Sequence, residues 1–200
     1  MVICSKFRLR CQCRRGKRKR ARRPFRQGDL DGLCGVYSVV NAVRTLCPEV
    51  DGDGAAWLFD KLIQSLRKVG ANPSIAVAGG VGRGEVESLI RAAIACVDDE
   101  YDVALAVRRL PKAMRQTKRL DELWQALATA ISPRTVAVLG LGGKQSHWTV
   151  AVGVSANQIR LFDSSCMNVL RRSDCTVGKG IKRTAIPPTH VILIARKKQG

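Results

Sequence analysis

Apolar residues change their spacing about halfway along this chain, and that change limits the folds open to it. In the first half they recur every three or four positions, which is the period of a helix with one buried face. The same spacing returns once in the second half. The helices predicted from this pattern span 33–46, 55–69, 84–97 and 120–131.

Short β-branched runs separated by turns dominate the second half, and such runs are typical of strands. The predicted strands span 102–107, 135–141, 148–154, 158–163 and 190–195. Helices first and strands last favour an α+β fold, here an N-terminal helical part packed on a C-terminal, mainly antiparallel sheet. A chain of 200 residues, 46% of them hydrophobic, suffices for one compact core.

Positive charge is concentrated at the N-terminus. Residues 1–26 hold twelve lysines and arginines and no acidic residue, whereas residues 27–200 hold 23 basic and 16 acidic residues. Because like charges repel and bury little, we predict that 1–26 is a disordered arm and 27–200 the folded domain. The charge implies non-specific attraction to polyanions. A specific role in binding nucleic acid, an acidic partner or an anionic membrane surface is the alternative.

Targeting and metal-binding signals are absent from the sequence. It holds no run of about 18 apolar residues, so no membrane span is predicted. No apolar region follows the basic N-terminus, so we expect a cytoplasmic protein, with delivery by a specialised secretion system left open. No histidine follows Cys4, Cys11 and Cys13 at zinc-finger spacing, and no C-x-x-C pair occurs. We therefore expect neither a metal nor another cofactor.

The segment 71–83 is rich in glycine and alanine and includes GGVGRGE. This stretch looks superficially like a phosphate-binding loop but lacks the Lys-Ser/Thr of a P-loop. We predict a flexible loop before a helix.

Cys34 is the first candidate for chemistry. It follows the turn-rich loop QGDLDGLCG and opens a predicted helix. The thiolate is the nucleophilic form of cysteine, and the positive end of a helix dipole stabilises it. Gly32 and Gly35 are expected to leave room for a substrate backbone to approach.

His147 is the candidate base, because it begins a predicted strand whose hairpin partner ends at Asp163, 16 residues later. An antiparallel hairpin places its two outer ends side by side, so the carboxylate can orient the imidazole. The only other histidine, His190, has no acidic residue close in sequence and is interpreted as a strand-edge or half-buried residue. The backbone N–H of Cys34 and the side chain of Gln27 are the candidate oxyanion donors.

The order of Gln27, Cys34-Gly35, His147-Trp148 and Asp163 resembles that of the papain-like cysteine peptidases. Within that group the chain most resembles the peptidases that cut double-glycine leaders from bacteriocins, and their uncharacterised relatives, over about residues 25–165. Two positions depart from the pattern. Gln27 precedes Cys34 by seven residues, one more than in the family, and Ser164-Ser165 stands where those enzymes usually place proline.

The resemblance implies a papain-like fold and a cysteine peptidase that cleaves a peptide or amide bond of a peptide or protein substrate. A Cys34 thioester would be the intermediate, with Cys34, His147 and Asp163 as the triad and Gln27 at the oxyanion. Trp148 is either a shield for the His147–Asp163 pair or an ordinary strand aromatic. The same site also suits a deamidase, a transamidase or a protease of ubiquitin-like modifiers. The remaining alternatives are a catalytically inactive relative and a non-catalytic nucleic-acid-binding protein that uses the basic arm.

Overall fold

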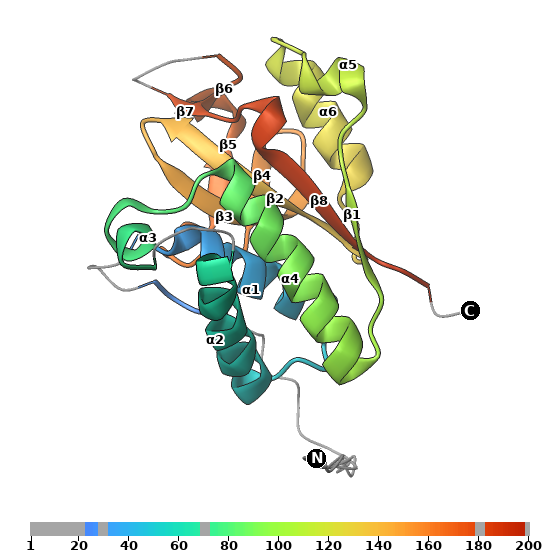
Figure 1. Ribbon diagram of the computed structural model, residues 1–200. Helices are drawn as coiled ribbons and strands as arrows, with labels where there is room; N and C mark the ends of the chain where they lie inside the picture. The colour runs from blue at the N-terminus through green and yellow to red at the C-terminus, as the bar shows by residue number, and fades with distance from the viewer. Residues whose placement is uncertain (1–22, 28–31, 69–72, 179–182, 199–200) are drawn as a thin grey trace, which may run out of the picture.

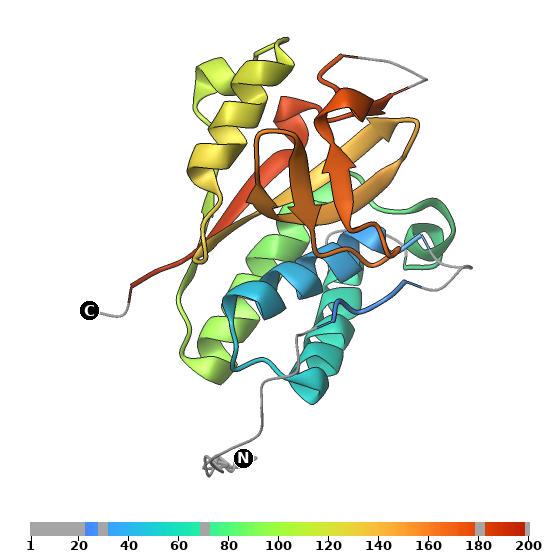
Figure 2. The same cartoon turned by 180° about the vertical axis from the view of Figure 1, so that it is seen from behind.

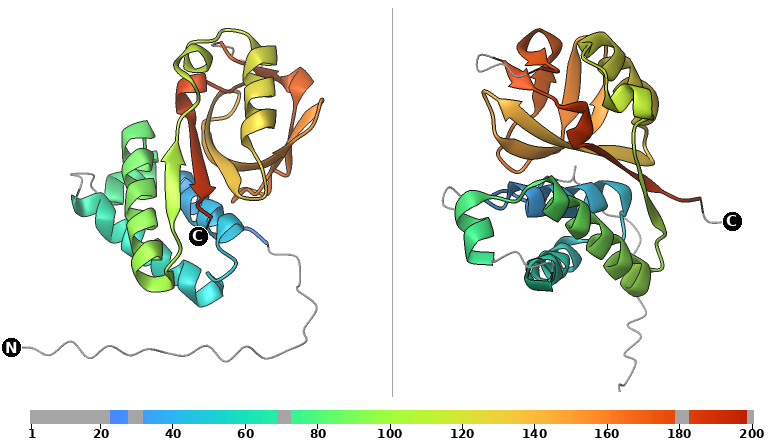
Figure 3. Two further views of the ribbon diagram at one scale, coloured as in Figure 1. Left: turned by 90° about the vertical axis from the view of Figure 1, so that its right-hand side faces the viewer. Right: turned by 45° about the horizontal axis from the view of Figure 1, so that its top comes forward.

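The computed structural model describes residues 23–27, 32–68, 73–178 and 183–198. Four helices come first and cluster on one side of the sheet (Figure 1). Two further helices follow the first strand and lie on the other side of the sheet, as the views from behind and from the side show (Figures 2 and 3). The six helices of the described residues are α1 (Cys34–Leu46), α2 (Gly52–Lys68), α3 (Pro73–Gly79), α4 (Arg83–Tyr101), α5 (Lys112–Arg115) and α6 (Leu120–Ala130).

The strands form one large sheet in the order β1-β8-β2-β3-β4-β5, and all of these neighbours pair antiparallel. Short β7 pairs antiparallel with the end of β2 and parallel with β6. The strands are β1 (Leu105–Arg108), β2 (Thr135–Gly143), β3 (His147–Val154), β4 (Gln158–Leu161), β5 (Val169–Arg171), β6 (Cys175–Thr176), β7 (Thr184–Ala185) and β8 (Val191–Arg196). The predicted α+β class with a mainly antiparallel sheet is confirmed.

Strand β2 shows why its sequence reads as a continuous apolar run. Successive side chains of a strand point to opposite faces. Val136 and Val138 join the core formed with α1, α2 and α4, whereas Ala137 and Leu139 join the core formed with α6. Both faces of the sheet centre are therefore buried, so no polar alternation is needed there.

Several predicted elements differ from the structure. Of the expected loop 71–83, residues 73–79 form α3, and α4 continues to Tyr101, four residues beyond its predicted end. The strand expected over 102–107 starts only at Leu105, and the strand expected to reach Asp163 ends at Leu161. The prediction missed α5 and the short strands β5, β6 and β7, because elements of two to four residues are too short to show a period.

The segment 23–27 is held against α1. Asn41 is fully buried, and its side chain accepts a hydrogen bond from the Phe25 N–H at 2.9 Å and donates one to the Phe25 carbonyl at 3.2 Å. Arg44 lies over the Phe25 ring, 4.4 Å from its centroid, and donates to the Arg23 carbonyl. Arg23 and Phe25 of the expected arm 1–26 thus contact the folded domain, and residues 1–22 lie outside the described part. These contacts fix the chain that leads to Gln27.

Within the described residues, no helix combines the length and the apolar character that a membrane crossing requires. The same residues contain no group of three or more His, Cys, Asp or Glu placed to hold a metal ion.

Candidate active site

Cys34 is the first residue of α1, as the turn-rich loop before a helical pattern predicts, and its side chain is half-buried. The neighbouring glycines serve the fold rather than a substrate. A Cβ on Gly35 would lie 2.3 Å from a Val81 methyl carbon, and one on Gly32 would lie 2.6 Å from the Gly80 backbone nitrogen. The expected room for a substrate backbone at Gly32 and Gly35 is therefore already filled by the 77–81 segment. The close approach instead fixes this segment beside Cys34.

His147 opens β3, and its imidazole contacts both other members of the predicted triad. Its Nε2 lies 2.7 Å from Asp163 Oδ2, and Cys34 is close enough to help favour the charged imidazole. Because Asp163 engages Nε2, Nδ1 is the ring nitrogen left for the thiol. The proximity expected from the β3–β4 hairpin is confirmed, even though the register shifts between Ala151 and Gly153.

Asp163 is held by both of its carboxylate oxygens. Oδ2 faces His147, and Oδ1 accepts the backbone N–H groups of Ser165 at 2.7 Å and Met167 at 3.2 Å. The residue is 3% exposed and lies just past the end of β4. An aspartate that binds backbone N–H groups two residues on is typical of a turn, so the carboxylate shapes the loop that follows it and cannot rotate away from His147.

The charges of these residues stabilise an ion pair. Burial opposes a charged His147, but the hydrogen bond and negative charge of Asp163, together with the nearby Cys34, outweigh it and raise the pKa of His147 to about 9. Burial likewise opposes the charged form of Asp163, yet the hydrogen bond and charge of His147 and the Ser165 N–H lower its pKa. At neutral pH His147 is therefore an imidazolium beside the Asp163 carboxylate.

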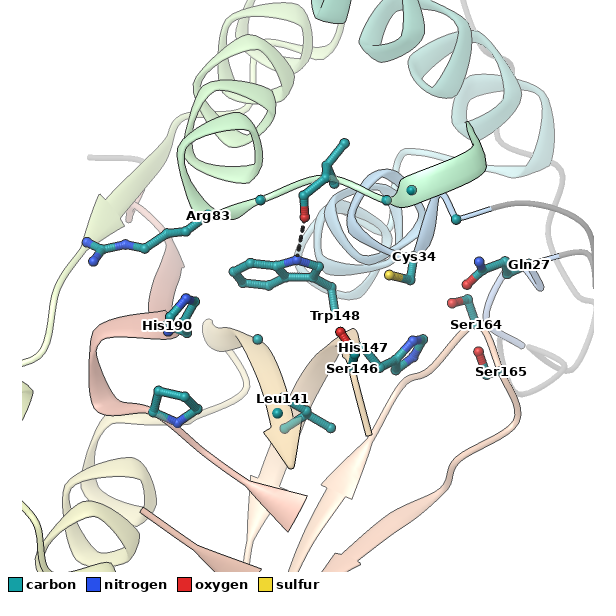
Figure 4. Close-up of a pocket in the computed structure, with 18 of the residues that line it drawn as sticks. Gln27, Cys34, Arg83, Leu141, Ser146, His147, Trp148, Ser164, Ser165 and His190 are labelled. Carbon is teal, nitrogen blue, oxygen red and sulfur yellow. Dashed lines mark hydrogen bonds between the residues drawn. The ribbon is translucent and has the colours of Figure 1, made fainter. Parts of the chain in front are cut away.

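Gln27 lies at the same site. Its backbone N–H donates to the Ser164 carbonyl at 3.1 Å, so the segment 23–27 bridges α1 and the loop after Asp163. In Figure 4 the side-chain amide of Gln27 points toward Cys34, with Ser164 beside it and His147 below. The extra residue between Gln27 and Cys34 thus does not remove the amide from the cysteine. Residues 28–31 lie outside the described part.

A pocket of about 870 Å³ runs from these residues to the far side of Trp148. One wall is the segment 78–83, the other is the end of β2, and the loop 164–166 closes the Cys34 end. Trp148 is buried and donates its indole N–H to the Val81 carbonyl at 2.9 Å. This hydrogen bond links β3 to the segment 78–83. Trp148 is therefore a lining residue of the pocket and not only an ordinary aromatic residue of a strand.

Three of the pocket residues that the sequence did not predict are His190, Arg83 and Ser164. His190 was expected to be a strand-edge or half-buried residue; it is half-buried, but its ring also faces Trp148 in the pocket, 5.9 Å away between ring centroids. Arg83 and Ser164 line the same pocket. No local pattern marks Arg83 or His190, since they reach the pocket from α4 and from the turn before β8.

Comparisons with known proteins return no relative. No protein-family model, no curated protein and no solved structure matches the chain. The class that the fold and the site define is thus an α+β protein in which a hydrogen-bonded histidine–aspartate pair lies beside a cysteine at one end of a pocket.

Proposed function

We propose that this protein is a papain-like cysteine peptidase. The single observation that carries the proposal is the chain of contacts from Cys34 to His147 to Asp163, with a His147 pKa of about 9. A structural histidine needs neither a cysteine at a helix start nor a buried carboxylate aligned with it. A thiol nucleophile needs both, because its base must be held in one orientation and must stabilise a thiolate.

The proposed reaction proceeds through a thioester. The Cys34 thiolate attacks the carbonyl carbon of a peptide bond, and the electron pair of the C=O bond moves to the oxygen. The backbone N–H of Cys34 and the side-chain amide of Gln27 stabilise that oxyanion. His147 gives its proton to the leaving amine as the C–N bond breaks, then takes a proton from water, which attacks the thioester and releases the acid and the Cys34 thiolate.

Peptide libraries test this proposal most simply. The protein is incubated with a library of tryptic peptides, and new N-termini are identified by mass spectrometry. We expect cleavage by the wild type and by Cys166→Ala, a control that removes an exposed cysteine of the same pocket, and none by Cys34→Ala. A mass change at glutamine without new N-termini would identify a deamidase or transamidase instead. Equal results for wild type and Cys34→Ala would contradict any role of Cys34 in acyl transfer.

A further inference from the structure

The pocket has a second end, on the far side of Trp148 from Cys34. Figure 4 shows Arg83 and His190 there, with the indole ring of Trp148 between them and the cysteine. Arg83 is the first residue of α4, and His190 ends the turn Pro188–His190 before β8. Two segments distant in the sequence therefore each contribute one lining residue with a nitrogen-bearing side chain to this end of the pocket.

Positive charge prevails along this pocket. Among the described residues that line it, Arg26, Arg83 and the protonated His147 carry positive charge and none is an aspartate or glutamate. Arg83 contacts Glu87 at 2.9 Å, but the same carboxylate also binds Arg109 at 2.8 Å. One carboxylate shared by two guanidinium groups leaves an excess of positive charge. The bond to Glu87 uses the Nε and Nη2 groups of Arg83, and a guanidinium has five N–H donors in all.

The other groups around Arg83 agree with this excess. The carboxylate of Glu85 lies against Gly82, at the start of α4, where the positive end of the helix dipole partly offsets its negative charge. Glu85 does not line the pocket. Burial and the charge of Arg83 lower the pKa of His190, so its imidazole is neutral at neutral pH and can accept or donate one hydrogen bond. The Nδ1 of His190 lies 3.4 Å from the Thr189 hydroxyl.

We propose that Arg83 and His190 form a subsite that binds a carboxylate of the substrate, separated from the cleaved bond by the breadth of the Trp148 ring. The inference rests on the proposed function and adds a specificity to it, namely a preference for peptides with an acidic residue near the bond that Cys34 attacks. A guanidinium matches a carboxylate in shape and charge, and a charge-assisted hydrogen bond of this kind is among the strongest available. The partly exposed Arg83 side chain is reachable from the pocket.

Matched alkylating reagents test the subsite without a known substrate. The reagents are iodoacetyl peptides in which a glycine spacer of increasing length ends in glutamate amide or, for comparison, glutamine amide. The rate of Cys34 alkylation is followed by mass spectrometry. At one spacer length we expect the glutamate reagent to react about tenfold faster than the glutamine reagent, and the difference to shrink in high salt.

Three variants locate the effect. Arg83→Gln should abolish the preference for glutamate, Arg83→Lys should keep part of it, and Arg91→Gln should keep all of it. Arg91 is the matched control because it lies on α4, is exposed and does not line this pocket. An unchanged rate with neutral iodoacetamide verifies that each variant is folded at Cys34.

The outcomes separate the two proposals. If Cys34 reacts readily with iodoacetamide but the glutamate and glutamine reagents are equal at every spacer length, the subsite is wrong and the peptidase proposal stands. Loss of the preference in Arg91→Gln as well as Arg83→Gln would also overturn the subsite, since only the overall charge would then matter. If Cys34 reacts no faster with iodoacetamide than Cys166 does, both proposals fall.

Discussion

The two ends of the pocket hold the only two histidines of the chain, and their surroundings are opposite in charge. Both imidazoles lose hydration by burial, which favours the neutral form. At one end Asp163 and Cys34 outweigh that effect and raise the pKa of His147 to about 9. At the other end Arg83 adds to it and lowers the pKa of His190. At neutral pH His147 therefore carries a proton, whereas His190 is neutral.

The opposite directions of the two pKa shifts come from the neighbouring charged groups and not from burial, which lowers both pKa values. The first end suits a reaction that needs a stored proton next to a thiolate, and the second suits the binding of an anion, which a neutral histidine beside an arginine does not repel. Since there are two histidines only, each can be followed separately by NMR, and the comparison can be tested residue by residue.

Asp163→Asn should have the largest effect at the Cys34 end. Asparagine keeps the shape but removes the charge, so the pKa of His147 should fall from about 9, and peptide cleavage should drop on the order of a thousandfold. NMR titration of the two histidine ring signals measures the first effect. Asp174→Asn, which alters an exposed carboxylate hydrogen-bonded to Ser173, is the control and should move neither histidine. An unchanged His147 titration in Asp163→Asn would contradict the assignment of the positive charge.

The pH dependence of stability should differ in sign between the two histidines. A raised pKa in the folded state means that the proton on His147 stabilises the fold below pH 6.5 and that this contribution is lost as the pH rises through about 9. Wild type should therefore lose about 1–3 kcal/mol of its unfolding free energy relative to His147→Ala between these limits. Relative to His190→Ala, wild type should instead lose stability as the pH falls, because folding disfavours the protonated His190. Urea denaturation from below pH 6.5, where His190 acts, up to above pH 9, where His147 acts, measures both effects, and equal trends would refute the comparison.

Asn41→Ala tests how the segment 23–27 contributes to the Cys34 end alone. The change leaves the Phe25 N–H and carbonyl without their partner, which should cost about 1–3 kcal/mol of unfolding free energy and lower the rate of peptide cleavage by displacing Gln27. Alkylation of Cys34 should persist, because His147 and Asp163 come from a separate hairpin. Thr45→Ala on the same helix is the control, since, among the described residues, its hydroxyl donates to the Asn41 backbone carbonyl and not to the segment 23–27. If Asn41→Ala slowed the alkylation of Cys34 as much as it slowed peptide cleavage, the segment 23–27 would position Cys34 itself and not only Gln27.

Arg83→Gln should have the smallest effect, confined to the second end. Removing the guanidinium charge should raise the pKa of His190 toward its usual value and leave His147 unchanged. The same NMR titration reports both signals, with Arg91→Gln for comparison. A shift of His147 in this variant would show that the two ends are electrostatically coupled, and the contrast between them would then be weaker than described.

The sequence predicted the first end far better than the second, for a physical reason. His147 and Asp163 lie at the outer ends of one hairpin, so local strand pattern and turn position suffice to bring them together. Cys34 was found because a glycine-rich loop before a helical period marks a helix start. Both signals act over fewer than about twenty residues, within the reach of periodicity.

The second end has no such local signal. Arg83 and His190 line one pocket although they are more than a hundred residues apart in the chain, and a sequence pattern read over a few residues cannot predict that arrangement. The role of Asn41 was likewise hidden, since a polar residue within an apolar helix reveals its partner, Phe25, only in three dimensions. The short α3 was missed because glycine and alanine carry little periodic signal.

The central claim, that His147 activates Cys34, is tested most directly by the pH dependence of iodoacetamide labelling in wild type and His147→Ala, mapped to each cysteine by mass spectrometry. Cys166 is the internal reference, because it is exposed whereas Cys34 is half-buried, so exposure alone predicts that Cys166 reacts faster. The account predicts that at pH 6 Cys34 reacts faster than Cys166 in wild type and loses this advantage in His147→Ala. Slower labelling of Cys34 than of Cys166 in both proteins would contradict it.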